Sequence, residues 1–329
     1  SSPGVRPGLK RISRLLASLG NPHLGIPAVH VVGTNGKGST AASLSAIFFA
    51  SGYRTALYTS PHLIHMGERL KINEQMVAEE KWSDHFKRLD AALKEDERLK
   101  SDPPTLFELI TALSLSIMAE EMPDVAIVEA GLGGRLDATN LINPVAMSVI
   151  TSIAMDHESF LGDTIFKIGE EKFAVLRPHG RAFFSGEPEE LIPLFKALCE
   201  RLDVSGHVLS EDWRVKNVRS SYNGNEYDLV GPDVKLTGLA THLLGLHQVK
   251  NTALAASSAW ELKDQFANVT EKSIREGLHN AKWPGRLEWV NENPPLLLDG
   301  AHNPHGMASL VKSLKVLFTE KAQFVILFA

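Results

Sequence analysis

The sequence has too few cysteines for an internal disulfide, because Cys199 is the only one among 329 residues. A lone cysteine fits a reducing compartment, and we therefore expect a cytoplasmic protein. The chain also lacks any apolar run near the ~18 residues that a membrane-spanning helix requires. We therefore expect no membrane partner.

Acidic residues are missing from the start of the chain, where no Asp or Glu occurs before Glu68. Cationic residues such as Lys10 and Lys37 do occur there, which suits an anionic ligand, although chance explains the distribution equally well. The formal net charge of −5 argues against general nucleic-acid binding. The length favours two domains, each large enough to bury a core.

The segment from 31 to 40, Val-Val-Gly-Thr-Asn-Gly-Lys-Gly-Ser-Thr, is the most informative part of the sequence. An apolar run at 28–32 predicts a strand before it, and the run at 41–50 predicts a helix after it. Glycines let backbone N–H groups approach an anion, the lysine adds a cation, and the helix N-terminus adds its dipole. A glycine-rich turn is the alternative. We predict a polyphosphate site made by Thr34, Asn35, Gly36, Lys37, Gly38, Ser39 and Thr40, with a Ser39 or Thr40 hydroxyl near Mg²⁺.

This segment differs from the common phosphate-binding loop at two positions. The common pattern has a glycine where this chain has Val31, and Ser or Thr directly after the lysine, where this chain has Gly38. The loop is therefore a variant of that pattern.

Strand and helix patterns alternate over the first 185 residues, which indicates a mostly parallel sheet covered by helices on both faces. The expected fold class is α/β, with a P-loop-type ATPase domain. Nearly continuous apolar runs predict strands at 28–32, 55–59, 125–128, 145–150 and 181–184. Helical periodicity predicts helices at 9–19, 39–51, 79–99, 105–120 and 164–176.

The pattern changes after residue 213. Alternating apolar residues around Asn223-Gly224 predict a small antiparallel sheet between 213 and 246. A helix at 249–266 follows, and then the sequence Trp-Pro-Gly-Arg at 283–286 breaks the pattern. Beyond it we predict a strand at 296–298, a helix at 307–317 and a strand at 324–328. We expect an ATP-binding domain at 1–281, a linker at 282–287, and the start of a C-terminal Rossmann-like α/β domain at 288–329.

Polar residues follow three of the predicted strands. Ser60 follows the second, Glu129 ends the third, and His157 comes after the fourth. Because parallel strands end at one edge of a sheet, these side chains should converge on a crevice, where a carboxylate suits Mg²⁺. The structural alternatives are a Ser-Pro turn, a glutamate that caps a turn and a histidine with a structural role.

Other polar groups are less informative alone. Glu171 and Lys172 belong to a charge run that is equally consistent with a solvated helix face. Arg286, Asp299 and His302 lie in Gly/Pro-rich turns, where a linker and a turn explain them as well. The residue pattern shows no Ser-His-Asp set and no catalytic cysteine, as expected for phosphoryl transfer, which needs positioning and charge neutralisation more than a protein nucleophile.

Taken together, these motifs resemble the folylpolyglutamate/dihydrofolate synthase branch of the Mur ligase superfamily. The resemblance spans nearly the whole chain, and its motifs keep the family's order and approximate spacing. They are Gly33–Ser39, Ser60-Pro61-His62, Thr105-Leu106-Phe107-Glu108, the run 129–140, Asp156-His157, Glu171-Lys172, Pro284-Gly285-Arg286 and the run 299–304.

The resemblance implies an ATP-dependent ligase that joins L-glutamate to dihydropteroate or a folate through an acyl phosphate. It implies two Mg²⁺ ions, with Ser60, Glu129 and His157 as metal ligands and a carbamylated Lys172. It gives catalytic roles to Lys37, Lys172 and His157. The nucleotide would contact Asn251, Arg286 and Asp299, the glutamate would contact His302, and the pterin side would contact Thr105, Phe107 and Asp137.

Four features leave parts of this assignment open. Phe173 follows Lys172 where the family usually has alanine, and the family's C-terminal domain is longer than the part we expect in this chain. Asp137 could brace the glycine turn beside Arg135 instead of binding a pterin. A muramyl-peptide ligase, another nucleotide-dependent kinase or ATPase, and a binding module that has lost activity are the alternative functions. We expect a monomer with dihydrofolate synthase activity and polyglutamate extension at the same site.

Overall fold

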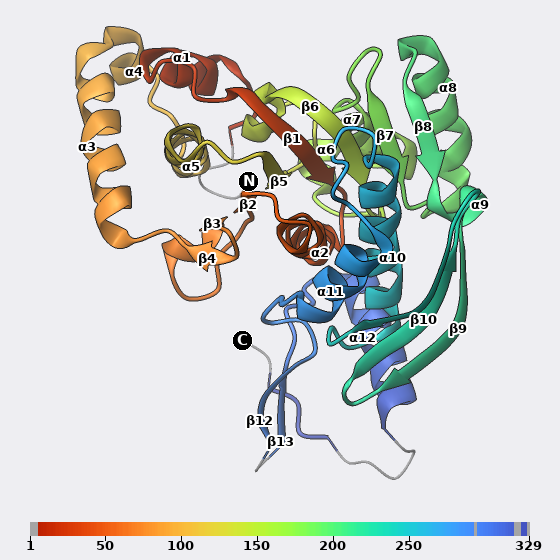
Figure 1. Cartoon of the computed structure of the whole chain (residues 1–329). Coiled ribbons are helices and arrows are strands. Elements are labelled where there is room, and N and C mark those ends of the chain that lie inside the picture. The colour runs from red at the N-terminus through yellow and green to blue at the C-terminus, as the bar shows by residue number, and fades with distance from the viewer. Residues whose placement is uncertain (1–5, 293–294, 319–323, 328–329) are drawn as a thin grey trace.

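The computed structural model describes residues 6–292, 295–318 and 324–327 (Figure 1). Its centre is an eight-stranded sheet in the order β4-β3-β2-β5-β1-β6-β7-β8. The strands are β1 (Leu24–Val32), β2 (Thr55–Tyr58), β3 (Leu70–Ile72), β4 (Gln75–Met76), β5 (Val125–Glu129), β6 (Asn143–Ile150), β7 (Arg181–Phe184) and β8 (Ser205–Val208).

The sheet is mostly parallel, as predicted. Strand β1 pairs in parallel with β5 and β6, and the same orientation continues to β2 on one side and to β7 and β8 on the other. Only the edge strands β3 and β4 run antiparallel. All five strands predicted in this region are confirmed, whereas the short strands β3, β4 and β8 were not predicted.

The helices between the strands are α1 (Lys10–Ser18), α2 (Lys37–Ala50), α3 (Glu79–Glu95), α4 (Glu97–Ser101), α5 (Leu106–Glu121), α6 (Glu158–Leu161), α7 (Ile165–Phe173), α8 (Ile192–Leu202) and α9 (Leu209–Asp212). Short 3₁₀ turns lie at Met66–Arg69, Ala138–Leu141 and Glu189–Leu191. The helix predicted at 79–99 is interrupted, because Asp96 has an extended backbone and its carboxylate accepts hydrogen bonds from the N–H groups of Arg98 and Leu99. Asp96 therefore caps a second helix, α4.

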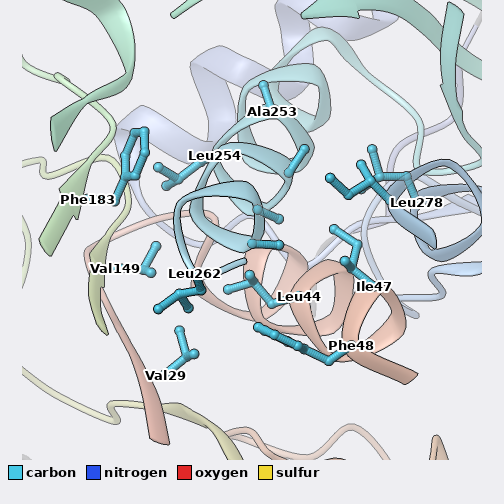
Figure 2. Close-up of a cluster of buried hydrophobic side chains, with 14 of the residues drawn as sticks. Val29, Leu44, Ile47, Phe48, Val149, Phe183, Ala253, Leu254, Leu262 and Leu278 are labelled. Carbon is cyan, nitrogen blue, oxygen red and sulfur yellow. The ribbon is translucent and has the colours of Figure 1, made fainter. Parts of the chain in front are cut away.

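Side chains of the central strands alternate between two hydrophobic cores. Val29 and Ile127 pack with α2 on one face, whereas Ala28 and Val128 pack with α1, α3 and α5 on the other (Figure 1). Figure 2 shows the first of these cores, in which Leu44, Ile47 and Phe48 of α2 lie among side chains from the sheet and from later helices. The residues labelled around them are Val29, Val149, Phe183, Ala253, Leu254, Leu262 and Leu278.

A second, three-stranded sheet covers the outer side of this core. Strands β9 (Arg214–Ser221), β10 (Gly224–Val230) and β11 (Lys235–Thr241) are antiparallel, which confirms the predicted small sheet. Helices α10 (Leu246–Glu261) and α11 (Glu271–Asn280) follow, and both pack against α2. Helix α2 is buried from Gly38 to Phe48, which explains why its apolar and small polar residues do not separate into an amphipathic pattern.

The last part of the described chain is a hairpin, β12 (Glu288–Glu292) and β13 (Pro295–Leu298), followed by α12 (Pro304–Leu317). A separate small core of Leu244, Leu287 and Leu317 joins it to the preceding domain. The strand predicted at 324–328 is wrong over 324–327, which has no regular structure: Val325 and Leu327 are 93% and 88% exposed, with no described strand beside them to pair with. Phe328 lies outside the described residues. The domain boundaries stay a prediction.

No helix in the described ranges is long and apolar enough to cross a bilayer.

Candidate active site

One cavity of about 1240 Å³ lies at the carboxyl ends of the parallel strands. Open α/β sheets bind ligands at this edge, because loops from neighbouring strands meet there. Its walls combine the predicted phosphate loop, the strand-end residues Ser60, Glu129 and His157, and residues of the C-terminal segment after 283. The predicted strand-end residues and the phosphate loop therefore line one shared cavity.

The phosphate loop joins β1 to α2 and is held by the neighbouring strand end. The N–H of Thr34 donates to the carbonyl of Ser152 over 2.8 Å, and its hydroxyl bonds to both backbone groups of Ala154. The amine of Lys37 donates to the carbonyl of Thr34 over 3.1 Å. The first turn of α2 therefore presents its N–H groups and the Lys37 cation to the cavity, an arrangement suited to phosphate.

Two glycines of the loop are required by side chains from distant segments. Gly36 has a φ of 86°, and a Cβ there would lie 2.3 Å from Oδ1 of Asn251. A Cβ on Gly38 would lie 2.2 Å from the ring of Trp283. The Trp283 contact explains why glycine stands where the common loop has Ser or Thr, and the Gly36 contact places Asn251 at the predicted nucleotide site.

Glu129 and Ser60 lie together at the ends of β5 and β2. Glu129 is 4% exposed, and its carboxylate accepts one hydrogen bond, from the Ser60 N–H at 3.1 Å. Burial raises the pKa of Glu129, although the Lys37 cation and the Ser60 N–H oppose this shift. A buried carboxylate with one protein donor and an adjacent hydroxyl fits Mg²⁺, which prefers one or two carboxylates plus phosphate and water.

His157 lines the same cavity but has a different environment. Its side chain is 52% exposed, its backbone is left-handed with a φ of 50°, and its Nε2 lies 3.8 Å from Asp156 Oδ1. The described part of the chain contains no group of three or more His, Cys, Asp or Glu residues arranged to hold a metal. The metal-ligand role of His157 therefore stays a prediction.

Lys172 on α7 is buried directly behind the phosphate loop. It is 3% exposed, and its amine donates to the carbonyl of Gly33 over 2.7 Å. Burial lowers the pKa of Lys172 to about 7, and the nearby Lys37 cation contributes. A large fraction of the amine is consequently neutral near neutral pH. The charge run at 170–172 is thus not wholly a solvated face, because its last member points into the site.

The C-terminal segment contributes the remaining wall. Arg286, Asp299 and His302 all line the cavity, and their contacts with nucleotide and glutamate stay a prediction. The Asp299 carboxylate accepts hydrogen bonds from the N–H groups of Leu287 and Ala301, so it also shapes its own loop. His302 Nδ1 lies 2.8 Å from the carbonyl of Gly300.

The three residues predicted on the pterin side do not line this cavity. Thr105 caps α5 through a hydrogen bond from the Glu108 N–H, and the ring of Phe107 packs against Gly131, which does line the cavity. Asp137 is 4% exposed, and its carboxylate accepts hydrogen bonds from the N–H of Leu132 and from Thr139. Asp137 therefore braces the glycine turn, and its role toward a substrate stays a prediction.

Sequence reasoning missed several residues of the cavity. The carboxylate of Glu68 accepts hydrogen bonds from the N–H groups of residues 63, 64 and 65 and so shapes a loop that carries exposed Leu63 and Ile64 on the cavity wall. Trp283, which lines the cavity, was noted only as part of a motif, and so was Asn303, which lies outside the lining. An Asn directly before a proline at a helix start was the available signal for Asn303, but it indicates a cap and not a partner.

Comparison with known proteins finds similar sequences and similar solved structures over most of the chain. A family model for the Mur ligase middle domain matches residues 31–259. The dihydrofolate synthase/folylpolyglutamate synthase of Bacillus subtilis is 35% identical over 317 residues, covering 96% of this chain and 74% of that protein. A solved FPGS–AMPPCP–folate complex is 31% identical with a TM-score of 0.92, covering 97% of this chain and 79% of that one. The folylpolyglutamate synthase of Thermotoga maritima is 37% identical with a TM-score of 0.85, covering 96% and 72%.

Proposed function

We propose that this chain, which belongs to the folylpolyglutamate/dihydrofolate synthase family of Mur ligases, is an ATP-dependent ligase. It would join L-glutamate to dihydropteroate or a folate. The single observation that carries this proposal is the cavity in which the phosphate loop, the Glu129 carboxylate and the C-terminal segment face one another. Such a cavity can hold a nucleotide triphosphate beside a carboxylic acid.

The reaction has two balanced steps. The acid's carboxylate oxygen attacks the γ-phosphorus of ATP, the bond to the β-phosphate oxygen breaks, and ADP leaves. The ammonium of glutamate gives one proton to a base, the resulting amine attacks the acyl carbon, and the C–O bond to phosphate breaks. The second amine proton leaves with the inorganic phosphate. Both steps depend on charge neutralisation and alignment more than on a protein nucleophile.

Different residues of this chain would bind the phosphates, the metal ion, the nucleotide and the glutamate. Backbone N–H groups of the loop and the Lys37 amine would hold the β- and γ-phosphates. Ser60 and Glu129, with His157 as a further candidate, would hold Mg²⁺. When bound, Mg²⁺ neutralises developing charge on the phosphate oxygens. The positions of Asn251, Arg286 and Asp299 support nucleotide contacts, and that of His302 supports a contact with glutamate.

The proposal is tested by measuring incorporation of isotope-labelled glutamate. We expect full-length protein with Mg-ATP to incorporate label into dihydropteroate and, more slowly, into reduced folates, with one ADP formed per amide bond. ATP hydrolysis without label in either product would contradict the ligase proposal. Label entering a UDP-muramyl acceptor instead would favour a muramyl-peptide ligase.

We further propose that Lys172 is carbamylated in the active protein. The step adds CO₂ to the neutral amine with loss of one proton, and it turns a cation into an oxygen ligand that could serve a second Mg²⁺. Burial of the amine and its lowered pKa support this modification. We expect a carbamate signal in ¹³C NMR with labelled bicarbonate, absent in Lys172→Arg.

A matched control lies on the same helix. Lys167 is exposed and pairs with Asp163, and this ion pair raises its pKa. Lys167→Arg should therefore keep the carbamate signal. A signal that survives in Lys172→Arg, or is lost equally in both variants, would refute the assignment to Lys172.

A substitution at Asp137 tests whether dihydropteroate or a folate is the preferred substrate. If its carboxylate also meets the N–H edge of a pterin, Asp137→Ala should lower activity with dihydropteroate at least several-fold more than activity with a folate that already carries glutamate. Equal losses on both substrates, together with a lower melting temperature, would leave only the bracing of the glycine turn. Steady-state rates with both acids and a thermal melt decide between these roles.

A further inference from the structure

Asn303 is a buried polar residue that the proposed chemistry does not use. It is 7% exposed, stands at the N-terminus of α12, and does not line the cavity. Buried amides require hydrogen-bond partners, so the partners of the Asn303 side chain indicate its role.

The side chain of Asn303 joins three segments of the chain. Its Oδ1 accepts from the N–H of Gly306 at 2.8 Å, which caps α12. Its Nδ2 donates to Oδ2 of Asp156 at 2.9 Å and to Oδ1 of Asn35 at 3.2 Å, and Asn35 Nδ2 returns a bond of 3.4 Å. Asn35 and Asn303 thus form a reciprocal amide pair.

The partner Asn35 belongs to the phosphate loop, directly before Gly36 and Lys37. The described hydrogen bonds of its side chain go only to Asn303 and, at 2.9 Å, to His305 Nδ1, both in the C-terminal segment. Asp156 directly precedes His157, and both residues line the cavity. Residues of the C-terminal segment therefore set the orientation of the Asn35 side chain, although Asn35 itself belongs to the phosphate loop.

We propose that Asn303 is a positioning residue through which the docked C-terminal segment sets the geometry of the phosphate loop. Nucleotide affinity and phosphoryl transfer then depend on that segment being in place. The ligation part of this inference rests on the proposed function, whereas the effect on nucleotide binding does not.

The decisive variant is Asn303→Asp, because it separates capping from positioning. Aspartate is as good an N-cap as asparagine, so α12 should stay intact. The variant loses both Nδ2 donors, however, and places a carboxylate against that of Asp156. Asn303→Ser also keeps a cap and removes the amide pair without adding charge. The exposed surface amide of Asn268 supplies the matched control, Asn268→Asp.

The measurement is calorimetric binding of AMPPCP with Mg²⁺, for the variants alone and in an Asp156→Asn background. We expect Asn303→Asp and Asn303→Ser to weaken binding about tenfold or more, since two or three hydrogen bonds are lost. In the Asp156→Asn background, Asn303→Asp should cost less than about threefold, because an amide again faces a carboxylate. Circular dichroism and a cooperative melt confirm that each variant folds.

Wild-type affinity in folded Asn303→Asp would overturn the inference, as would a loss of the same size in both backgrounds. In the ligation assay the same variants should lower kcat as well as affinity, and the Asp156→Asn background should restore both for Asn303→Asp, which a damaged α12 cap would not allow. Should the wild type bind AMPPCP but fail to incorporate glutamate, the proposed function falls while the role of Asn303 is still decided by the binding data.

Discussion

Lys37→Ala should lower kcat/KM for ligation by about a hundredfold to a thousandfold, equivalent to ~2.7–4 kcal/mol of transition-state stabilisation. The amine lies at the start of α2 on the cavity wall, and its described hydrogen bond goes to the carbonyl of Thr34. The Lys37 side chain therefore contributes little to the stability of the fold, and its amine is available to bind a phosphate. Steady-state kinetics with varied ATP measure the loss, and a thermal melt should show no comparable change in stability.

A matched control removes a lysine that faces solvent. Lys94 is 74% exposed, and its described ion pair is with Asp90 one helical turn away, so Lys94→Ala should retain full activity. Near wild-type turnover in folded Lys37→Ala would show that the loop does not hold the transferred phosphate, and the site assignment would fail with it.

Glu129→Gln should raise the Mg²⁺ concentration needed for half-maximal ligation by about tenfold or more. The substitution keeps an oxygen that accepts from the Ser60 N–H, and it removes the charge that a hard cation prefers. His157→Ala should shift the same Mg²⁺ dependence if His157 is also a ligand. Rates measured over a Mg²⁺ titration at saturating ATP give both values.

Stability gives a second readout for Glu129 that does not depend on turnover. Because burial raises the pKa of Glu129 in the folded protein, its ionised form opposes folding at neutral pH, and that opposition fades as pH falls through the folded pKa. Glu129→Gln without Mg²⁺ should therefore melt no lower than the wild type. Its melting temperature should also rise less than that of the wild type on addition of Mg²⁺ with AMPPCP.

The control for His157→Ala is a histidine whose backbone also has a positive φ. His179 also has a positive φ, of 58°, and its exposed side chain pairs with Asp203 far from the cavity lining. His179→Ala should leave the Mg²⁺ dependence unchanged. If His157→Ala behaves like His179→Ala while Glu129→Gln does not, His157 is not a metal ligand.

Features encoded within a few neighbouring residues could be predicted from the sequence. The apolar strand, the glycine spacing and Lys37 identify the phosphate loop because all its anion-binding groups lie within one short segment. Strand-end positions placed Ser60 and Glu129 in one cavity, since every parallel strand ends at the same edge. The helix start at Asp96 was missed because a local cap competes with a periodic pattern that continues through it.

Only the tertiary structure decided the contacts between residues far apart in the chain. Asn35 and Asn303 are separated by 268 residues, and no local pattern specifies which amide a buried amide will meet. Likewise, glycine at position 38 is explained by the ring of Trp283, and the bracing role of Asp137 by hydrogen bonds that form only once the turn has closed. The sequence by itself determined the type of site, because phosphate binding uses short-range backbone geometry. Packing determined which side chains hold that geometry, because burial forces each polar group to find its partner in the folded chain.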